Sequence, residues 1–366
     1  MKPNLRGLRP EEIEAILRRE RPGAAPGILP AQLFGGLLRE RHPEVAAIPE
    51  IGGRRRDLVA ELFSDRGLEL VERRPAPDRS VRHVFRLHDG HLVESVLLWH
   101  HDLWTVCVSS QAGCPLACSF CATGMLGLRR DLEPWEIVDQ VVQVGRLADV
   151  RINDVVFMGM GEPLLNEASV FAAAEILNHP LGPQIGRKRI TISTSGIVPA
   201  IHRFIDEGRR WRLVFSLSSA VPEKRARLMP VQKRWDFASF LDAVRRYEAH
   251  RRHKHVTLEY IAIRNLTMGD DDIDAIREHL TDFNCILNVI PLNPVGNDEL
   301  EAPTMAEVRA WTARLRPLGI PVKIRYSGGQ DERAGCGQLG RALMEEGRLA
   351  PRLRVVGAPP SGPAGR

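Results

Sequence analysis

From residue 104 onward, short apolar runs alternate with helix-forming segments, and this alternation restricts the fold more than any other feature of the sequence. About six strand–helix repeats are present, which predicts parallel strands joined by crossover helices. Six repeats are too few for a closed eight-fold barrel. Periodicity alone leaves an open partial barrel and a flat doubly wound sheet as alternatives. The expected strands are Trp104–Ser109, Asp154–Met158, Arg189–Ser193, Arg212–Leu217, His255–Ile263, Cys285–Ile290 and Pro321–Tyr326.

The segment before these repeats predicts helices and then a hairpin. Three helices are expected within residues 1–75, at 10–19, 31–41 and 57–63, the first of which opens with Pro and two Glu near its positive end. Residues 73–80 contain two prolines and indicate a linker. The apolar runs 81–87 and 92–99 flank an Asp-Gly pair, which is typical of a β-hairpin.

Composition places the chain among soluble globular proteins. It has 366 residues, 43% of them hydrophobic, and so can bury a large core. No apolar run approaches the ~18 residues that cross a bilayer, and the first residues lack the apolar core of a signal peptide. We therefore expect a cytoplasmic protein without a membrane segment. In a reducing compartment, its six cysteines favour metal binding or catalysis over a disulfide framework.

Three of these cysteines form the motif Cys114-Pro-Leu-Ala-Cys118-Ser-Phe-Cys121, directly after the first strand of the repeats. Four thiolates normally close a [4Fe-4S] cluster. A local set of three can hold three irons and leaves the fourth iron open to another ligand. The alternative is a zinc site with Cys107 or His101 as fourth ligand, although zinc sites usually pair two short Cys/His hooks and only one is present here.

Positive charge is concentrated in one stretch of the sequence. The net charge of the chain is +5, but residues 181–260 contain 17 Lys/Arg against 7 Asp/Glu, a net charge of +10. Such a stretch favours a polyanionic partner bound in a salt-dependent way. A solvated face on Arg-rich helices explains the charge equally well.

Polar residues follow several of the expected strands. Loops after parallel strands gather at one rim, where sites in such folds are built. Gly161 and Glu162 could bind a ligand or form a tight strand-to-helix turn. Each Ser and Asn could hydrogen-bond a ligand or cap the helix that follows, as these residues often do. The residues at these positions are Gly161 and Glu162 after the second strand, Ser193 and Ser195 after the third, Ser216 and Ser218 after the fourth, and Asn293 after the sixth.

Five motifs in order resemble the radical S-adenosylmethionine (SAM) RNA adenine methyltransferases. This family includes the ribosomal RNA adenine-C2 methyltransferase, which in some bacteria also modifies transfer RNA, and the C8-methylating resistance enzyme. The resemblance spans residues 94–339 and is carried by Val108-Ser-Ser-Gln-Ala-Gly-Cys-Pro-Leu-Ala-Cys-Ser-Phe-Cys-Ala-Thr-Gly, Met158-Gly-Met-Gly-Glu-Pro-Leu-Leu-Asn, Ser193-Thr-Ser-Gly, Ile290-Pro-Leu-Asn-Pro and Gly335-Cys-Gly-Gln-Leu.

The resemblance implies an α/β fold, a partial (β/α)6 radical-SAM barrel over residues 110–345 that ends in a catalytic loop. Residues 1–75 would be a small helical RNA-binding accessory domain, 76–109 a linker and β-hairpin, and 346–366 a disordered tail. The implied partners are ribosomal and/or transfer RNA and an electron donor such as flavodoxin or ferredoxin, and we expect a monomer.

The resemblance also implies cofactors and the residues that hold them. One [4Fe-4S] cluster would be bound by Cys114, Cys118 and Cys121, and two SAM molecules would be used per turnover. The family's SAM-binding positions correspond to Gly161, Glu162, Ser193, Ser216, Leu217, Ser218 and Asn293.

Three catalytic residues follow from the same resemblance. Cys336 would be methylated by one SAM. A 5′-deoxyadenosyl radical from the second would then take a hydrogen from the S-methyl group, and the carbon radical would add to adenine. Cys107 would resolve the adduct by forming a transient disulfide with Cys336, and Glu94 would accept the ring proton. Glu94 shares a strand face with leucines and valines, so burial would raise its pKa toward a useful range unless that face turns to solvent.

Departures from the family pattern bear on the RNA target. Ser216-Leu-Ser218 replaces the usual Ser-Leu-His, and Gln330-Asp-Glu-Arg-Ala-Gly replaces Asp-Ile-Asp-Ala-Ala. We favour C2 of adenine, with C8 as the alternative. Two other functions stay open: a radical-SAM enzyme acting on a protein or small molecule, which would not need the pair Cys107 and Cys336, and a non-catalytic iron–sulfur RNA sensor. Cys285 matches no functional position and is expected in the core.

Overall fold

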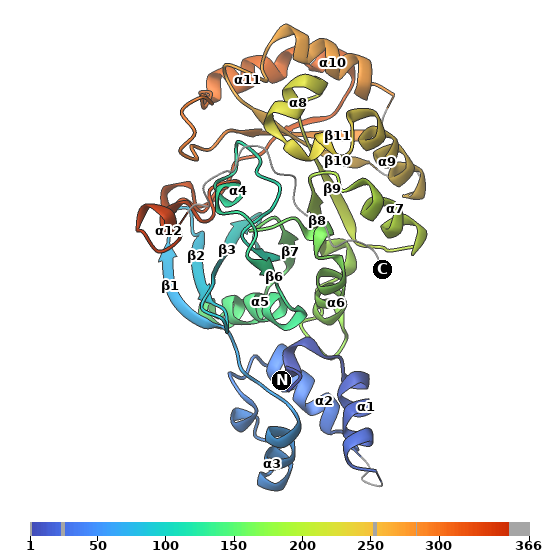
Figure 1. Ribbon diagram of the computed structural model, residues 1–366, viewed down its shortest axis with the longest axis vertical. Coiled ribbons are helices and arrows are strands. Elements are labelled where there is room, and N and C mark those ends of the chain that lie inside the picture. The colour runs from blue at the N-terminus through green and yellow to red at the C-terminus, as the bar shows by residue number, and fades with distance from the viewer. Residues whose placement is uncertain (1, 23–25, 252–254, 283, 351–366) are drawn as a thin grey trace.

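The computed structural model describes residues 2–22, 26–251, 255–282 and 284–350. Its first elements are the helices α1 (Pro10–Glu20), α2 (Leu29–Phe34) and α3 (Gly53–Leu62), which lie below one end of the sheet in Figure 1. Ile13 and Leu17, one turn apart on α1, are buried, and Pro10 occupies the first helical position, as the sequence predicts. α2 continues into a π-helical turn, Gly35–Arg39. The tail predicted from residue 346 lies outside the described residues from 351 on.

A buried ion pair joins the first residues to the rest of the chain. Arg6 Nε lies 2.9 Å from Asp139 Oδ1 on α5 (Pro134–Ala148), with both side chains 2% exposed or less. Asp139 also accepts the Leu68 N–H at 2.6 Å, and Arg6 donates to the carbonyl oxygens of Pro43 and Asp65. These contacts dock the amino-terminal segment on α5.

Removing the carboxylate of this pair is expected to destabilise the protein strongly. Asp139→Ala leaves the Arg6 guanidinium buried and unpaired, which costs about 3–5 kcal/mol in the free energy of unfolding. The exposed pair Arg21–Glu61, 2.6 Å apart, is the matched control, and Glu61→Ala should change that free energy by less than about 1 kcal/mol. Denaturant unfolding measures both values, and equal losses in the two variants would contradict this account.

Next come four antiparallel strands, of which β2 and β3 form the predicted hairpin. They are β1 (Glu69–Pro75), β2 (Val81–Arg86), β3 (Leu92–His100) and β4 (Leu103–Cys107). The turn between β2 and β3 contains Gly90 at φ +86°, a conformation that favours glycine. The linker was predicted to begin at residue 73, but this start is wrong because β1 continues to Pro75. β1 is an edge strand, where proline removes no ladder hydrogen bond.

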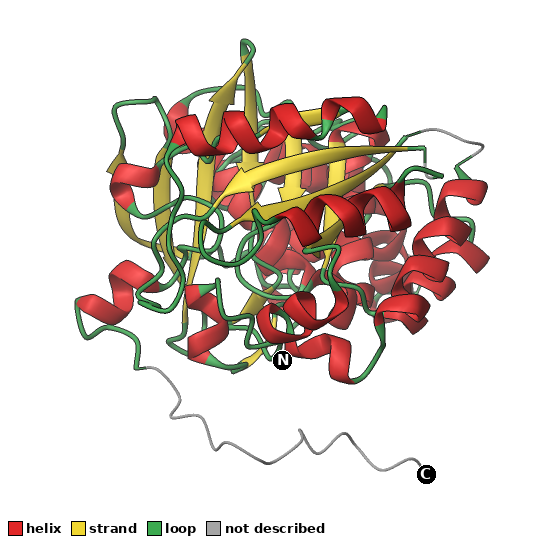
Figure 2. Cartoon of the chain, turned by 90° about the horizontal axis from the view of Figure 1, so that it is seen from above, coloured by secondary structure: helices red, strands yellow, loops and turns green. Residues whose placement is uncertain are grey.

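From β4 on, the strands of this ten-stranded sheet are parallel, and each lies beside the next one along the chain. β7 (Asp154–Phe157), β8 (Ile190–Thr194), β9 (Arg212–Ser218), β10 (Val256–Ala262), β11 (Cys285–Pro291) and β12 (Val322–Ile324) extend the sheet to its other edge. The strand order never reverses along this part of the sheet. Because crossover connections between parallel strands are right-handed, the connecting helices then all lie on the same face of the sheet. A doubly wound sheet would instead reverse its order at a switch point. The strands change direction markedly across the sheet in Figure 2. The fold is therefore the predicted partial barrel.

The connecting helices lie between the strands, as the predicted strand–helix alternation requires. They are α5, α6 (Glu167–Asn178), α7 (Val198–Asp206), α9 (Phe237–His250), α10 (Asp270–Leu280) and α11 (Met305–Arg314). Three short helices were not predicted from the sequence, namely α4 (Ala122–Leu126), α8 (Pro222–Leu228) and α12 (Arg341–Glu345). The small antiparallel ladder of β5 (Gln111–Ala112) with β6 (Arg130–Asp131) was not predicted either. Within the described residues, no helix combines the length and apolar character that a membrane span needs.

Candidate functional site

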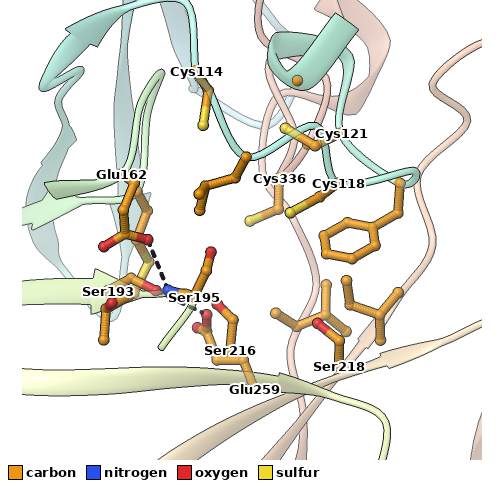
Figure 3. Close-up of a pocket in the computed structure, with 18 of the residues that line it drawn as sticks. Cys114, Cys118, Cys121, Glu162, Ser193, Ser195, Ser216, Ser218, Glu259 and Cys336 are labelled. Carbon is orange, nitrogen blue, oxygen red and sulfur yellow. Dashed lines mark hydrogen bonds between the residues drawn. The ribbon is translucent and has the colours of Figure 1, made fainter. Parts of the chain in front are cut away.

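A cavity opens at the carboxyl ends of the parallel strands (Figure 3). Its walls come from the loop that carries Cys114, Cys118 and Cys121, from the ends of β7–β11 and from the loop that carries Cys336. Of the predicted site residues, the cavity also brings together Gly161, Glu162, Ser193, Ser216, Ser218 and Asn293. Leu217, Cys107 and Glu94 are buried and are not among the residues that line it.

The cysteine loop is shaped by a close backbone approach. Gly113 has φ +81°, and a Cβ at this position would lie 1.9 Å from the Gly127 carbonyl oxygen, so only glycine fits. The loop then presents Cys114 on one side of the cavity and Cys118 and Cys121 on the other (Figure 3). Burial raises the pKa of Cys114 well above its ordinary value, and the thiols of Cys118 and Cys121 act in the same direction.

The three thiols line one cavity, a placement that suits an iron–sulfur cubane. Nowhere in the described part of the chain do three or more His, Cys, Asp or Glu side chains converge on one point that could hold a metal ion. Three thiolates that surround a volume can each bind one iron of a cubane, whereas a zinc ligand set meets at a single centre. Neither Cys107 nor His101, the two candidates for a fourth zinc ligand, lines this cavity.

Glu162 is fixed in the cavity wall by backbone donors. It is buried, its Oε2 accepts the Ser195 N–H at 2.8 Å and its Oε1 accepts the Leu164 N–H at 3.0 Å (Figure 3). Burial raises the pKa of this carboxyl group, and the backbone N–H donors act against the shift. Gly161 has φ +105°, and a Cβ there would lie 2.6 Å from Gln111 Cβ. The glycine therefore lets the loop pack tightly and leaves the carboxylate facing the cavity.

The serines and asparagine at the strand ends do not cap helices. α7, α8 and α11 begin after Ile197, Val221 and Thr304, so the capping alternative fails for these positions. Ser218 has φ +60°, and its buried hydroxyl has no hydrogen-bond partner among the described residues. Because burying a polar group without a partner is costly, this hydroxyl is available to a ligand in the cavity.

The loop of Cys336 is tied to the cysteine loop and to the end of β11. The Ala122 N–H donates to the Gly337 carbonyl at 2.7 Å, and Thr123 Oγ1 donates to Leu339. Asn293 Nδ2 donates to the Cys336 carbonyl at 3.0 Å. These bonds hold the Cys336 side chain in the cavity, where it remains exposed.

Cys107 is the last residue of β4, and its thiol interacts electrostatically with that of Cys336. Burial raises the pKa of Cys107 to about 12, and the nearby Cys336 thiol acts in the same direction. The pKa of Cys336 is raised, mainly by desolvation in the cavity, and the guanidinium of Arg325 acts against this shift. Both cysteines are free thiols, as are the other four. Cys285 is in the core, as expected.

Glu94 is fully buried on β3, which excludes the solvent-facing alternative. Its Oε1 lies 2.6 Å from Arg82 Nη1, and its Oε2 accepts the Gly340 N–H. Burial raises the pKa of Glu94, whereas Arg82 acts in the opposite direction. The carboxylate thus contacts the loop of Cys336 four residues beyond the cysteine.

Sequence reasoning missed Glu259, a second carboxylate in the cavity. It lies on β10, is 8% exposed, and is 3.4 Å from both Arg325 Nη1 and Ser193 Oγ. Burial raises its pKa, and Arg325 opposes the shift. The available signal was a lone Glu inside the apolar strand 256–262, since a charged residue in a buried strand usually has a specific partner.

The basic stretch 181–260 is divided between the two ends of the barrel. Arg187–Arg189 and Arg209–Arg212 precede β8 and β9, so they lie at the end away from the cavity. Arg227, Lys233 and Arg234 follow β9 and lie at the end that holds it. Only the second group is placed beside the site.

Comparisons with known proteins agree with this geometry. Residues 108–280 match the family described as the Radical SAM superfamily. A probable RNA methyltransferase of Myxococcus xanthus is 39% identical over 98% of this chain and 99% of its own length. A probable dual-specificity RNA methyltransferase RlmN of Heliobacterium modesticaldum is 38% identical over 94% of this chain and 91% of its own. The crystal structure of a radical SAM methyltransferase from Sphaerobacter thermophilus superposes with a TM-score of 0.87 at 34% identity, covering 93% of this chain and 99% of that one.

Proposed function

The chain belongs to the family of radical SAM RNA methyltransferases, and we propose that it methylates a ring carbon of an adenine in ribosomal and/or transfer RNA. C2 is the favoured position and C8 the alternative. The observation that carries the proposal is the presence of Cys336 in one cavity with Cys114, Cys118 and Cys121. A reactive carbon cannot be generated on a cysteine unless that cysteine is near the cofactors.

The family uses SAM and a [4Fe-4S] cluster, and the cavity has residues suited to both. Cys114, Cys118 and Cys121 would hold the cluster. The Glu162 carboxylate would receive the SAM ammonium group, while the free hydroxyl of Ser218 would meet another polar group of SAM. The other proposed SAM contacts are Gly161, Ser193, Ser216, Leu217 and Asn293. When bound, the cluster supplies the electron that cleaves SAM to methionine and a 5′-deoxyadenosyl radical.

Cys336 would act as the methyl carrier. Its thiolate attacks the methyl group of one SAM, so that an S–C bond forms as the sulfonium–methyl bond breaks. The 5′-deoxyadenosyl radical from a second SAM would take a hydrogen atom from the S-methyl group, giving 5′-deoxyadenosine, and the methylene carbon would bond to the adenine ring. The radical adduct would then lose one electron, for which the oxidised cluster is the acceptor. Two SAM molecules are therefore used in each turnover.

Cys107 and Glu94 would complete the reaction. The Cys107 thiolate would attack the Cys336 sulfur, and a transient disulfide would form as the bond between that sulfur and the new carbon breaks. That carbon would take up a proton and become the methyl group. Glu94 accepts the ring proton. Because Glu94 is bonded to Arg82 and Gly340 and does not line the cavity, this role requires the Cys336 loop to move and release the carboxylate.

Partners and location follow from the same proposal. RNA would contact the basic residues Arg227, Lys233 and Arg234 at the cavity end and the helices within residues 1–75. Flavodoxin or ferredoxin would supply the electron. We propose a monomeric, cytoplasmic enzyme.

Deleting the gene should remove one methyladenine from total RNA, as read by mass spectrometry of digested nucleosides. The wild-type chain should restore the product, and Cys114→Ala should not, because a cluster ligand is lost. Cys285→Ala is the matched control, since this buried thiol lies outside the cavity, and it should restore the product fully. An unchanged nucleoside profile in the deletion strain would refute the RNA substrate.

A further inference from the structure

Arg225, on α8, is a buried arginine close to the cysteine loop. Its side chain is 1% exposed, and its guanidinium lies 4.2 Å from the centre of the Phe240 ring. Nε donates to the Leu217 carbonyl at 3.1 Å, Nη1 to Gln232 Oε1 at 2.9 Å, and Nη2 to the Ser195 carbonyl at 2.9 Å. All of these acceptors are uncharged. The N–H groups of Arg225 therefore have hydrogen-bond partners, but its positive charge has no negative partner.

No carboxylate in the described part of the chain lies within 4 Å of the Arg225 guanidinium. The other arginines buried to a similar degree, Arg6 and Arg82, are paired with Asp139 and Glu94. Desolvation lowers the pKa of Arg225 to about 10. A buried unpaired charge costs several kcal/mol in a folded protein, so an anion that joins this site would be bound favourably.

The anion best placed to do so is the one held by the cysteine loop. The end of α8 contacts this loop, because the Ser119 N–H donates to the Leu228 carbonyl at 3.0 Å. Nη2 of Arg225 also donates to the Ser216 carbonyl at 3.4 Å, and Ser195, Ser216 and Cys118 all line the cavity. The buried cation is therefore hydrogen-bonded to the wall of the cavity that holds the three candidate cluster ligands.

We propose that Arg225 is the charge partner of the iron–sulfur cluster and raises its reduction potential. The inference rests on the cluster of the proposed function. Reduction adds one electron to the cluster and so increases its negative charge. A fixed cation in a low-dielectric interior stabilises the reduced form more than the oxidised form. Arg225 is a positioning residue in this account, since it reaches the cavity through the carbonyl groups of Ser195 and Ser216 and not by contact with substrate.

The test is a redox titration of the reconstituted holoenzyme under anaerobic conditions, without SAM, followed by the electron paramagnetic resonance signal of the reduced cluster. Arg225→Met removes the charge but keeps much of the apolar volume, and its midpoint potential should move to more negative values. Arg225→Lys keeps a cation and should stay closer to wild type. Arg227→Met is the matched control on the same helix. Its side chain is 59% exposed and screened by water, so the midpoint should not change.

An Arg225→Met protein with full iron content and the wild-type midpoint would overturn the inference. So would a difference that appears only after SAM is added, because Arg225 would then act on SAM and not on the cluster. If Arg225→Met takes up no cluster, Arg225→Gln serves as the second neutral variant. Loss of the cluster in both neutral variants but not in Arg225→Lys supports the charge role, whereas loss in all three refutes it. Wild-type protein that binds no iron would instead be a failure of the proposed function, seen before any titration.

Discussion

Cys336→Ala is expected to abolish RNA methylation completely while leaving about four irons bound per chain. The methyl carbon must form a bond to the sulfur of this residue before it can reach the adenine, and alanine offers no nucleophile. The cluster should persist because Cys114, Cys118 and Cys121 are unchanged. Peptide mapping of the wild-type enzyme should find a methyl group on Cys336, and nucleoside mass spectrometry should find no product from the variant.

Cys336→Ser separates the chemistry from the packing at this position. Serine is close in size, but its hydroxyl is ionised far less readily than a thiol, so this variant should also be inactive. Undiminished methylation by either variant would rule out Cys336 as the methyl carrier.

Cys107→Ala is expected to trap RNA on the protein. The proposed role of Cys107 begins only after the carbon–carbon bond has formed, so the variant should bind the cluster, methylate Cys336 and add to the base before it stalls. Protein isolated from cells should carry covalently attached RNA, visible as a nuclease-sensitive shift on a denaturing gel. The loss of one sulfur from the core should cost only ~1 kcal/mol in stability.

The double variant Cys107→Ala/Cys336→Ala is the control for this adduct. It lacks the sulfur to which RNA would be attached, so the shift should disappear. Normal turnover by Cys107→Ala without attached RNA would refute the resolving role, and Cys107 would then be a buried thiol of the strand β4.

The strands and helices of the partial barrel could be predicted from the sequence, because each of them is marked by a pattern of neighbouring residues. The pattern could not reveal β1, since the two prolines within 73–80 outweigh a short run of apolar residues, and the ladder with β2 that stabilises β1 is a non-local contact. α8 was also missed. It has seven residues, and most of its stability comes from contacts with Ser119, Gln232 and Asp272 that lie elsewhere in the chain.

Most residues that line the cavity could be predicted from the sequence, but the side chains with which they pair could not. Loops after parallel strands share one rim, so Glu162, Ser193 and Asn293 could be grouped without coordinates. The burial of Glu94 was expected from its strand face, but its ion pair with Arg82 depends on the β2–β3 register, which pattern alone does not fix. Arg225 was counted as part of a charged surface because Glu-Lys-Arg-Ala-Arg contains no signal that separates its buried arginine from its exposed one.

The buried pair Arg6–Asp139 limits how chimaeras of this family can be made. An amino-terminal segment taken from one relative and joined to the barrel of another must bring an arginine that meets an acid on α5, or a charge is left buried alone. Removal of residues 1–62 would also leave Asp139 without its partner, and it would expose the face of α5 on which these residues pack. The proposed contact of this segment with RNA is therefore better tested with point variants of its exposed arginines, such as Arg54, than by deleting or exchanging the segment.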